Sequence, residues 1–133
     1  MTTRTLRALS PQECLGLLEP GGVGRVGLMS ADGIVMLPVN YAIAANTVVF
    51  RTAPDTLLAA LANGPASFQA DRLAEVSREG WSVLVQGRVH IVAGEREVRS
   101  LERETHLMPW ADGARDVWVR IVPVRITGRR LEP

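Results

Sequence analysis

The sequence predicts a mainly β protein, a small antiparallel barrel of about six strands with two or three short flanking helices. Runs of β-branched and apolar residues follow one another with breaks of about three residues, which is typical of hairpins with short loops. The clearest run, Trp81–Val92, alternates apolar and polar side chains with the period of a strand. Long helical segments do not separate the runs, so a doubly wound parallel sheet is disfavoured.

The first expected element is a short helix that begins after Ser10. Ser10 can cap the helix, Pro11 suits its first position, and Glu13 supplies the other half of a capping box. The run Pro20–Gly22 ends the helix.

Three strands are expected next, one from Gly24, one over Ile34–Ile43 and one over Thr47–Arg51. Pro38 lies inside the second strand and cannot donate a ladder hydrogen bond. It therefore predicts that this strand lies at an edge or carries a bulge.

A second short helix is expected from near Asp55 to Leu61, and it is followed by a strand over Ala66–Ala70. Beyond the Trp81–Val92 strand, Glu95–His106 is rich in helix formers and charge, which indicates a solvent-exposed helix. The last strand, Val117–Leu131, switches its apolar face at Pro123. A bulge is expected there, because one extra residue reverses the phase.

The length and composition of the chain exclude several classes of protein function. The 133 residues suit one domain over residues 1–133, and the single cysteine, Cys14, excludes an internal disulfide framework. All 15 basic residues are arginine, which excludes Schiff-base chemistry and a Walker-type phosphate lysine. The net charge of +1 argues against a nucleic-acid partner. An apolar stretch of membrane-spanning length and a secretory leader are both missing from the sequence, so we expect a cytoplasmic protein without a membrane partner.

Two sequence patterns that could indicate a binding site do not meet the structural requirements of such a site. Gly22–Gly27 has the letters of the dinucleotide fingerprint, but a helix precedes it and a strand follows it, the reverse of what that fingerprint requires. His90 and His106 share no metal-ligand spacing with Cys14, so we expect no metal site. A catalytic residue is not identified either, because no serine stands in a nucleophile elbow.

Three segments carry the candidate binding residues. Leu37–Tyr41 is an apolar strand with one amide, and Gly80–Val83 opens the strongest strand. Phe50–Thr52 lies at a strand end just before the helix expected near Asp55. An arginine, a hydroxyl and a helix N-terminus so close in sequence form a phosphate-binding corner.

In this combination the chain resembles the pyridoxamine 5′-phosphate oxidase-like family of flavin-binding split β-barrels. It looks most like the small subgroup that includes nitroimidazole-resistance-type proteins. The matching stretches follow in order along nearly the whole chain: Ser10–Glu13, Gly24–Val26, Pro38–Tyr41, Phe50–Pro54, Phe68–Asp71, Gly80–Val83, Pro109–Trp110 and Ile126–Arg130.

The resemblance implies a six-stranded split barrel that forms a homodimer and holds two FMN molecules at the subunit interface. The implied contacts, by position, are Pro38, Val39 and Asn40 along the isoalloxazine ring, Arg51 and Thr52 at the phosphate, and Trp81, Ser82 and Val83 near the ring. We expect Trp81 to lie in the core or at a dimer interface, and we expect the same of Trp110 and Trp118.

Two positions after Arg51 depart from the family pattern. Leu57 stands where a lysine is usual, and Asp55 stands where a glycine is usual. A lost charge-assisted hydrogen bond weakens cofactor affinity by roughly tenfold to a hundredfold. Gln69 replaces a usual carboxylate, which partly offsets Asp55.

The resulting hypothesis is an FMN-dependent oxidoreductase of unknown substrate. A second interpretation keeps the fold and replaces FMN by a deazaflavin coenzyme, since the missing lysine fits such a change. A third is a dimeric split-barrel binding module without redox activity, for which Asp55 and Leu57 are the best support.

Overall fold

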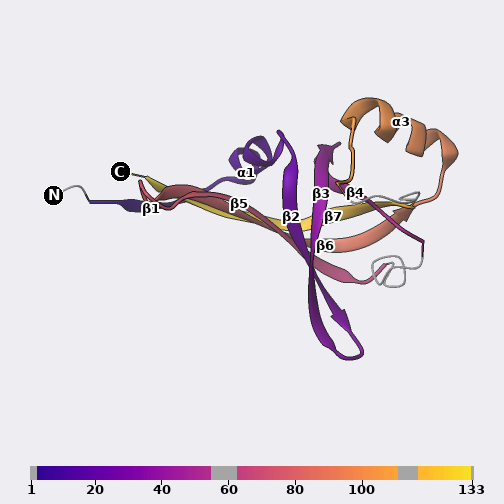
Figure 1. Ribbon diagram of the computed structural model, residues 1–133, viewed down its shortest axis with the longest axis horizontal. Helices are drawn as coiled ribbons and strands as arrows, with labels where there is room; N and C mark the ends of the chain where they lie inside the picture. Colours follow the sequence, from indigo (N-terminus) through magenta and orange to yellow (C-terminus); the bar gives the residue numbers. More distant parts are fainter. Residues whose placement is uncertain (1–2, 55–62, 111–116, 133) are drawn as a thin grey trace.

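The computed structural model describes residues 3–54, 63–110 and 117–132 (Figure 1). The helix expected between Asp55 and Leu61 lies outside these ranges. The strands are β1 (Thr5–Leu9), β2 (Gly22–Ser30), β3 (Gly33–Ala44), β4 (Thr47–Thr52), β5 (Pro65–Ala74), β6 (Glu79–Val92) and β7 (Val117–Glu132), and the helices are α1 (Pro11–Leu18) and α3 (Glu95–Thr105).

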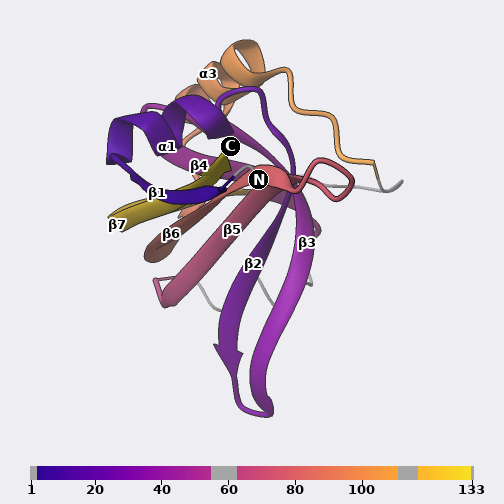
Figure 2. The same cartoon turned by 90° about the vertical axis from the view of Figure 1, so that its left-hand side faces the viewer.

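All strand pairs are antiparallel, and the order β7-β4-β3-β2-β5-β6 closes into a six-stranded barrel because β6 also pairs with β7. One edge of β7 is shared: β4 pairs with Val117–Ile121, and β1 pairs with Gly128–Glu132. The barrel is therefore split along β7, and β5, β6 and β7 extend together away from the barrel towards β1 (Figures 1 and 2). The predicted mainly β antiparallel split barrel is confirmed.

Strand β1 was not expected from the sequence. Four of its five residues are exposed and only Leu9 is buried, so the segment carries almost no hydrophobic pattern. Backbone pairing with the end of β7 forms the strand instead, and the Arg7 Nε donates to Glu132 Oε1 at 3.1 Å across that pair.

The capping box of α1 is confirmed. The Ser10 hydroxyl accepts from the Glu13 backbone N–H at 3.1 Å, and the Ser10 N–H donates to Glu13 Oε1 at 3.1 Å. Pro38 also behaves as predicted. It pairs with Arg25 of β2 on one side, whereas the β4 ladder begins only at Tyr41, so in the described chain Pro38 lies at an edge.

The bulge predicted near Pro123 is confirmed at the next residue. Gln86 of β6 pairs with Arg125 and Gly87 pairs with Pro123, which leaves Val124 as the extra residue on β7. The residues of β7 that point away from the interior therefore change from even-numbered before the bulge to odd-numbered after it.

Two apolar clusters hold the fold. The main cluster fills the barrel, and a second packs α3 against the outside of β3, β4 and β7. Trp118 belongs to the second cluster and is 2% exposed, as expected of a core residue. Trp110 follows α3, is 80% exposed and lies outside both clusters. It is therefore not a core residue of the single chain, and its expected place at a dimer interface stays a prediction.

Candidate functional site

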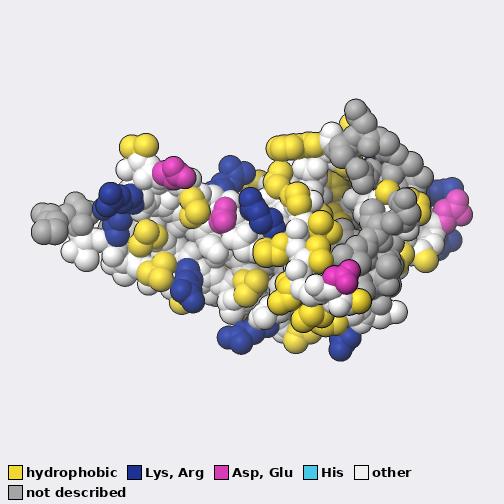
Figure 3. Space-filling view, turned by 60° about the horizontal axis from the view of Figure 1, so that its bottom comes forward, with side chains coloured by type: hydrophobic (Ala, Val, Ile, Leu, Met, Phe, Trp, Pro, Cys, Tyr) yellow, Lys and Arg dark blue, Asp and Glu magenta, His cyan; other side chains and the backbone are white. Residues whose placement is uncertain are grey.

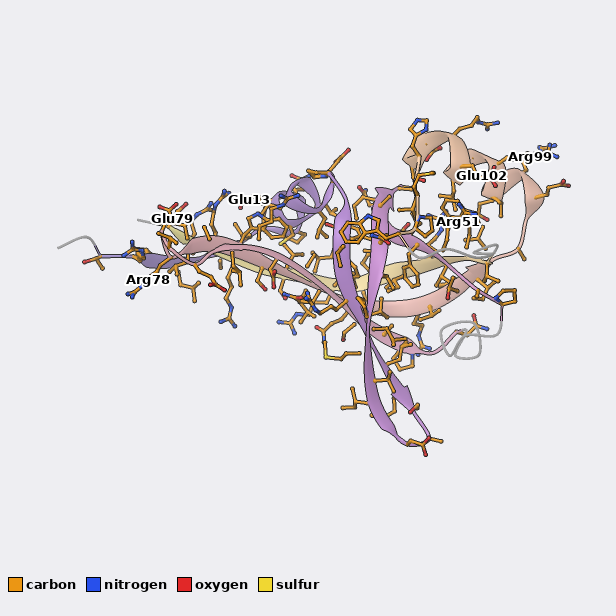
Figure 4. The ribbon with its side chains drawn as sticks, viewed as in Figure 1. Glu13, Arg51, Arg78, Glu79, Arg99 and Glu102 are labelled. Carbon is orange, nitrogen blue, oxygen red and sulfur yellow. The ribbon has the colours of Figure 1, made fainter. Side chains whose placement is uncertain are left out.

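Strands β3 and β4 place two predicted site residues side by side. Tyr41 pairs with Phe50, so Asn40 and Arg51 are the next residues along the two strands. Side chains alternate along a strand, and Tyr41 and Phe50 point into the barrel core. Asn40 and Arg51 therefore both point to the outer side of the sheet, towards α3, where Figure 4 shows Arg51.

A buried tryptophan supports the guanidinium of Arg51. Arg51 pairs with Trp118 of β7, and its Cζ atom lies 5.3 Å from the centre of the Trp118 ring. Such a cation–π contact is worth about 2 kcal/mol where the groups are shielded from water. The N–H donors of a guanidinium lie in one plane, which is the geometry that bidentate phosphate recognition uses.

Asn40 connects β3 to the segment after α3. Its Oδ1 accepts a hydrogen bond from the Trp110 backbone N–H at 2.9 Å. The amide nitrogen Nδ2 is thereby left as the donor that a ligand can meet. Asn40 also lines a hollow of about 330 Å³ together with Tyr41, His106 and Trp110. Burial raises the pKa of Tyr41, so its hydroxyl stays protonated at neutral pH.

Pro38, Val39 and Thr52 have different orientations around this point. Pro38 is exposed on the outer side next to Asn40, whereas Val39 packs against the main cluster. Thr52 is 4% exposed and follows Arg51 at the end of β4, on the inner side of the strand. A ligand on the outer side would meet Val39 through its backbone rather than its side chain.

The third predicted segment lies elsewhere. Trp81 and Val83 are buried in the main cluster, as expected for Trp81, while Ser82 is exposed on the outer side of β6. Ser82 pairs with Arg129 near the end of β7, but Arg51 pairs with Trp118 near its beginning. One chain therefore brings together Pro38, Asn40 and Arg51, but it does not bring Ser82 to them.

Two contributors at this site were missed by sequence reasoning. Trp118 was expected in the core or at a dimer interface, but its contact with the Arg51 guanidinium was not expected. The Trp110 backbone N–H was not expected to hold Asn40. Both contacts join residues far apart in the sequence, and neither leaves a local pattern that could predict it.

The site offers a guanidinium for an anion, an amide donor for ring heteroatoms, and the apolar edge of Pro38. This set suits a planar heteroaromatic ligand with an anionic tail. In the described ranges no group of three or more metal-ligating side chains comes together, and none of the helices there is long and apolar enough to cross a bilayer.

The sequence and the fold are similar to those of known proteins. Residues 10–130 match the family described as pyridoxamine 5′-phosphate oxidase. An FAD-binding protein from Mycobacterium smegmatis is 34% identical, with a TM-score of 0.80 over 92% of this chain and 96% of that one. A Corynebacterium glutamicum protein assigned as a pyridoxamine 5′-phosphate oxidase is 30% identical, with a TM-score of 0.81 over 98% and 95%.

A more distant structure shares the fold alone. This is a Bacteroides thetaiotaomicron protein assigned to 5-nitroimidazole antibiotic resistance, which is 14% identical with a TM-score of 0.68 over 98% of this chain and 90% of that one. The family match spans nearly every element of the barrel, from the cap of α1 to the end of β7. The chain therefore belongs to the pyridoxamine 5′-phosphate oxidase-like family.

Proposed function

We propose that this protein is a flavin-dependent oxidoreductase that binds FMN beside Asn40 and Arg51. The observation that carries the proposal is the placement of Asn40 on β3 next to Arg51 on β4, with the Arg51 guanidinium 5.3 Å from the centre of the Trp118 ring. The FAD-binding relative from M. smegmatis supports a flavin as the ligand class. A bound flavin supplies hydride or electron transfer, and the protein supplies binding and orientation.

The residues have distinct roles in this proposal. Arg51 binds the phosphate through its N–H donors. The Thr52 side chain is buried on the inner side of β4, so Thr52 would meet the phosphate only through its backbone. Pro38 and the backbone of Val39 lie along the isoalloxazine ring, and Asn40 donates from Nδ2 to a ring acceptor. The Asn40 Oδ1 keeps its bond to Trp110, which fixes the direction in which Nδ2 points.

The proposed assembly is a homodimer with the coenzyme between the two copies. Ser82 lies away from Arg51 within one chain, so only a second copy can bring Ser82 to the ring. The β2–β3 hairpin also carries large exposed apolar side chains, Met29, Ile34 and Met36, of the kind that protein interfaces cover.

The test is an FMN titration of Arg51→Ala, followed by flavin fluorescence. We expect affinity to fall by roughly tenfold to a hundredfold, since one charge-assisted phosphate contact is lost. Arg99→Ala is the matched control, because Arg99 is exposed on α3 and pairs only with Glu95 in the described chain. Unchanged FMN affinity in Arg51→Ala, with the fold intact by circular dichroism, would overturn the phosphate role.

The two alternatives are separated by a competition titration. Leu57, in place of the usual lysine, favours a deazaflavin coenzyme or a protein without redox activity. FMN and a deazaflavin coenzyme compete for the same protein, and tighter binding of FMN eliminates the deazaflavin alternative. A stable dimer that binds neither coenzyme supports the binding module.

A further inference from the structure

Three strands place the two proposed coenzyme residues in one row on the outer side of the sheet. Arg51 of β4 pairs with Trp118 of β7, and Asn40 of β3 lies next to Arg51 on its other side. In the neighbouring row, Val49 of β4 pairs with Arg120 of β7. Successive outward residues of a strand are about 7 Å apart, so the two rows are close neighbours.

Helix α3 covers both rows. Its Leu101 is 2% exposed and belongs to the second cluster together with Val49 and Trp118. Figures 1 and 2 show α3 on the side of the barrel opposite to the β2–β3 hairpin. Figure 3 shows the hairpin side, where hydrophobic side chains are open to view. The cover that α3 provides is therefore on the side that carries Asn40 and Arg51.

An ion pair also ties α3 to these strands. Glu97 Oε1 accepts from Arg120 Nη2 at 3.0 Å, and Arg120 Nη1 donates to Thr47 Oγ1 at 2.6 Å and to the Ala44 carbonyl oxygen at 3.4 Å. The Arg120 side chain is 15% exposed, so water and salt screen this contact less than they screen an exposed pair. The docked position of α3 thus depends on an apolar contact at Leu101 and a polar contact at Glu97.

The helix itself depends on its contacts with the sheet. It has 11 residues, and an isolated helix of that length is marginal in water. Of these described residues Leu101 alone is buried, and the N-cap residue Gly94 makes no side-chain capping bond. A substitution that weakens docking should therefore loosen the whole of α3.

Two contacts connect α3 to the proposed coenzyme residues. Trp118 belongs to the cluster under α3, and its ring centre lies 5.3 Å from Cζ of Arg51. The chain that follows α3 packs against the same cluster at Leu107, and the Trp110 backbone N–H then donates to Asn40 Oδ1 at 2.9 Å. Arg51 and Asn40 are thus each held by a group whose place depends on α3.

We propose that α3 is a positioning element of the coenzyme site, so that α3 residues remote from Asn40 and Arg51 control coenzyme affinity. Trp118 and Trp110 are its positioning residues. Trp118 orients the Arg51 guanidinium for the phosphate, and the Trp110 backbone N–H orients Asn40 for the ring. The inference rests on the proposed function and adds to it a dependence on a helix that does not carry either binding residue. Such coupling is reciprocal, so bound coenzyme holds α3 on the sheet in turn.

The Trp118 contact is tested by titrating FMN and riboflavin, which differ only by the phosphate. Trp118→Leu should weaken FMN binding by roughly threefold to thirtyfold and leave riboflavin binding unchanged, because the contact acts on the phosphate ligand Arg51. Trp118→Phe keeps an aromatic face beside Arg51 and should restore most of the FMN affinity. Val85→Ala opens a cavity in the main cluster instead, and so controls for a general loss of stability.

The dependence on α3 is tested by a matched pair of substitutions in its first turn. Glu97 and Glu95 each accept an arginine ion pair at 3.0 Å, but Glu97 pairs with Arg120 of β7 and Glu95 pairs with Arg99 of α3 itself. Glu97→Ala should weaken FMN binding by roughly twofold or more, whereas Glu95→Ala should leave it unchanged. Bound FMN should also slow amide hydrogen exchange in α3.

A measurement without coenzyme tests the position of Arg51 directly. The ring current of Trp118 shifts the NMR signal of the Arg51 Nε–H group, and Arg51→Ala identifies that signal by its loss. Trp118→Leu and Glu97→Ala should both move the signal towards the position of an ordinary arginine, and Glu95→Ala should not move it.

The outcomes separate this inference from the proposed function. Wild-type protein that binds no FMN, or Arg51→Ala that binds FMN normally, contradicts the proposed function, and the Arg51 signal then decides whether α3 positions Arg51. If Arg51→Ala loses FMN affinity but Glu97→Ala matches Glu95→Ala in both affinity and spectrum, the inference about α3 is overturned. Equal losses of FMN and riboflavin affinity in Trp118→Leu would overturn the positioning role of Trp118.

Discussion

The two halves of β7 use arginine in opposite ways. Before the bulge, Arg120 lies beneath α3 with its side chain 15% exposed, and it donates to Glu97 Oε1 at 3.0 Å and to Thr47 Oγ1 at 2.6 Å. After the bulge, Arg125 and Arg129 line a hollow, and no acidic residue occurs among its lining residues in the described part of the chain. An arginine whose donors are satisfied inside the protein holds elements together, whereas one left unmatched on a concave surface can bind an anion.

The bulge at Val124 separates these two environments. Gly87 of β6 faces it, and a Cβ atom at Gly87 would overlap the carbonyl oxygen of Val122. The glycine lets the strands approach closely at this point, and the extra residue then turns Arg125 and Arg129 outward. Without the phase change these two side chains would point into the barrel.

The largest expected effect comes from removing the packing under α3. Trp118→Ala should lower the free energy of unfolding by about 3–5 kcal/mol, because it opens a large cavity in the second cluster. Trp110→Ala is the matched control, since this exposed tryptophan should change stability by less than about 0.5 kcal/mol. Urea denaturation followed by circular dichroism measures both. Similar losses in the two variants would show that α3 does not depend on its buried tryptophan.

The elements that were predicted correctly had local signals. The capping box of α1, the edge position of Pro38 and the bulge near Pro123 each follow from a few neighbouring residues. Strand β1 had no such signal, because its exposed residues show no apolar alternation and pairing with the distant end of β7 holds it in place.

The candidate site was predictable only in part. The sequence indicated Asn40, Arg51 and Ser82, but their relative positions depend on closure of the barrel. Register places Asn40 beside Arg51 and moves Ser82 towards the far end of β7. The grouping of Arg25, Arg88, Arg125 and Arg129 along two hollows was not predictable, because these arginines come from three strands. Among the described residues that line the two hollows there is no aspartate or glutamate, and this too depends on how the strands pair.

A smaller loss of stability should distinguish the arginines before and after the bulge of β7. Arg120→Met should destabilise the fold by about 1–3 kcal/mol, since Glu97 and Thr47 lose a donor in a half-covered site. Arg125→Met should stay within about 0.5 kcal/mol, because that side chain holds no internal partner in the described structure. Thermal unfolding of both variants at one pH checks the contrast. Equal destabilisation by the two substitutions would mean that Arg125, like Arg120, stabilises the fold.

The smallest effect tests whether pairing alone makes an arginine structural. Arg7 donates to Glu13 at 3.0 Å and to Glu132 at 3.1 Å, as Arg120 does to its own partners, but Arg7 is solvent-exposed. Water and salt screen exposed ion pairs, so Arg7→Met should lower the melting temperature less than Arg120→Met does. In 1 M salt, Arg7→Met and the wild type should have the same melting temperature.

The pH dependence of stability independently tests the ion pairs that Arg7 makes with Glu13 and Glu132. The Ser10 backbone N–H, followed by Arg7, lowers the pKa of Glu13 below its ordinary 4.5. A lowered folded-state pKa adds stability that is present above pH 4.5 and is lost as the pH falls through the lowered value. Glu13→Gln should therefore show a smaller drop in melting temperature than wild type between pH 6 and pH 3. If the two drops are the same, the cluster adds no charge-dependent stability, and burial rather than pairing accounts for the difference between Arg7 and Arg120.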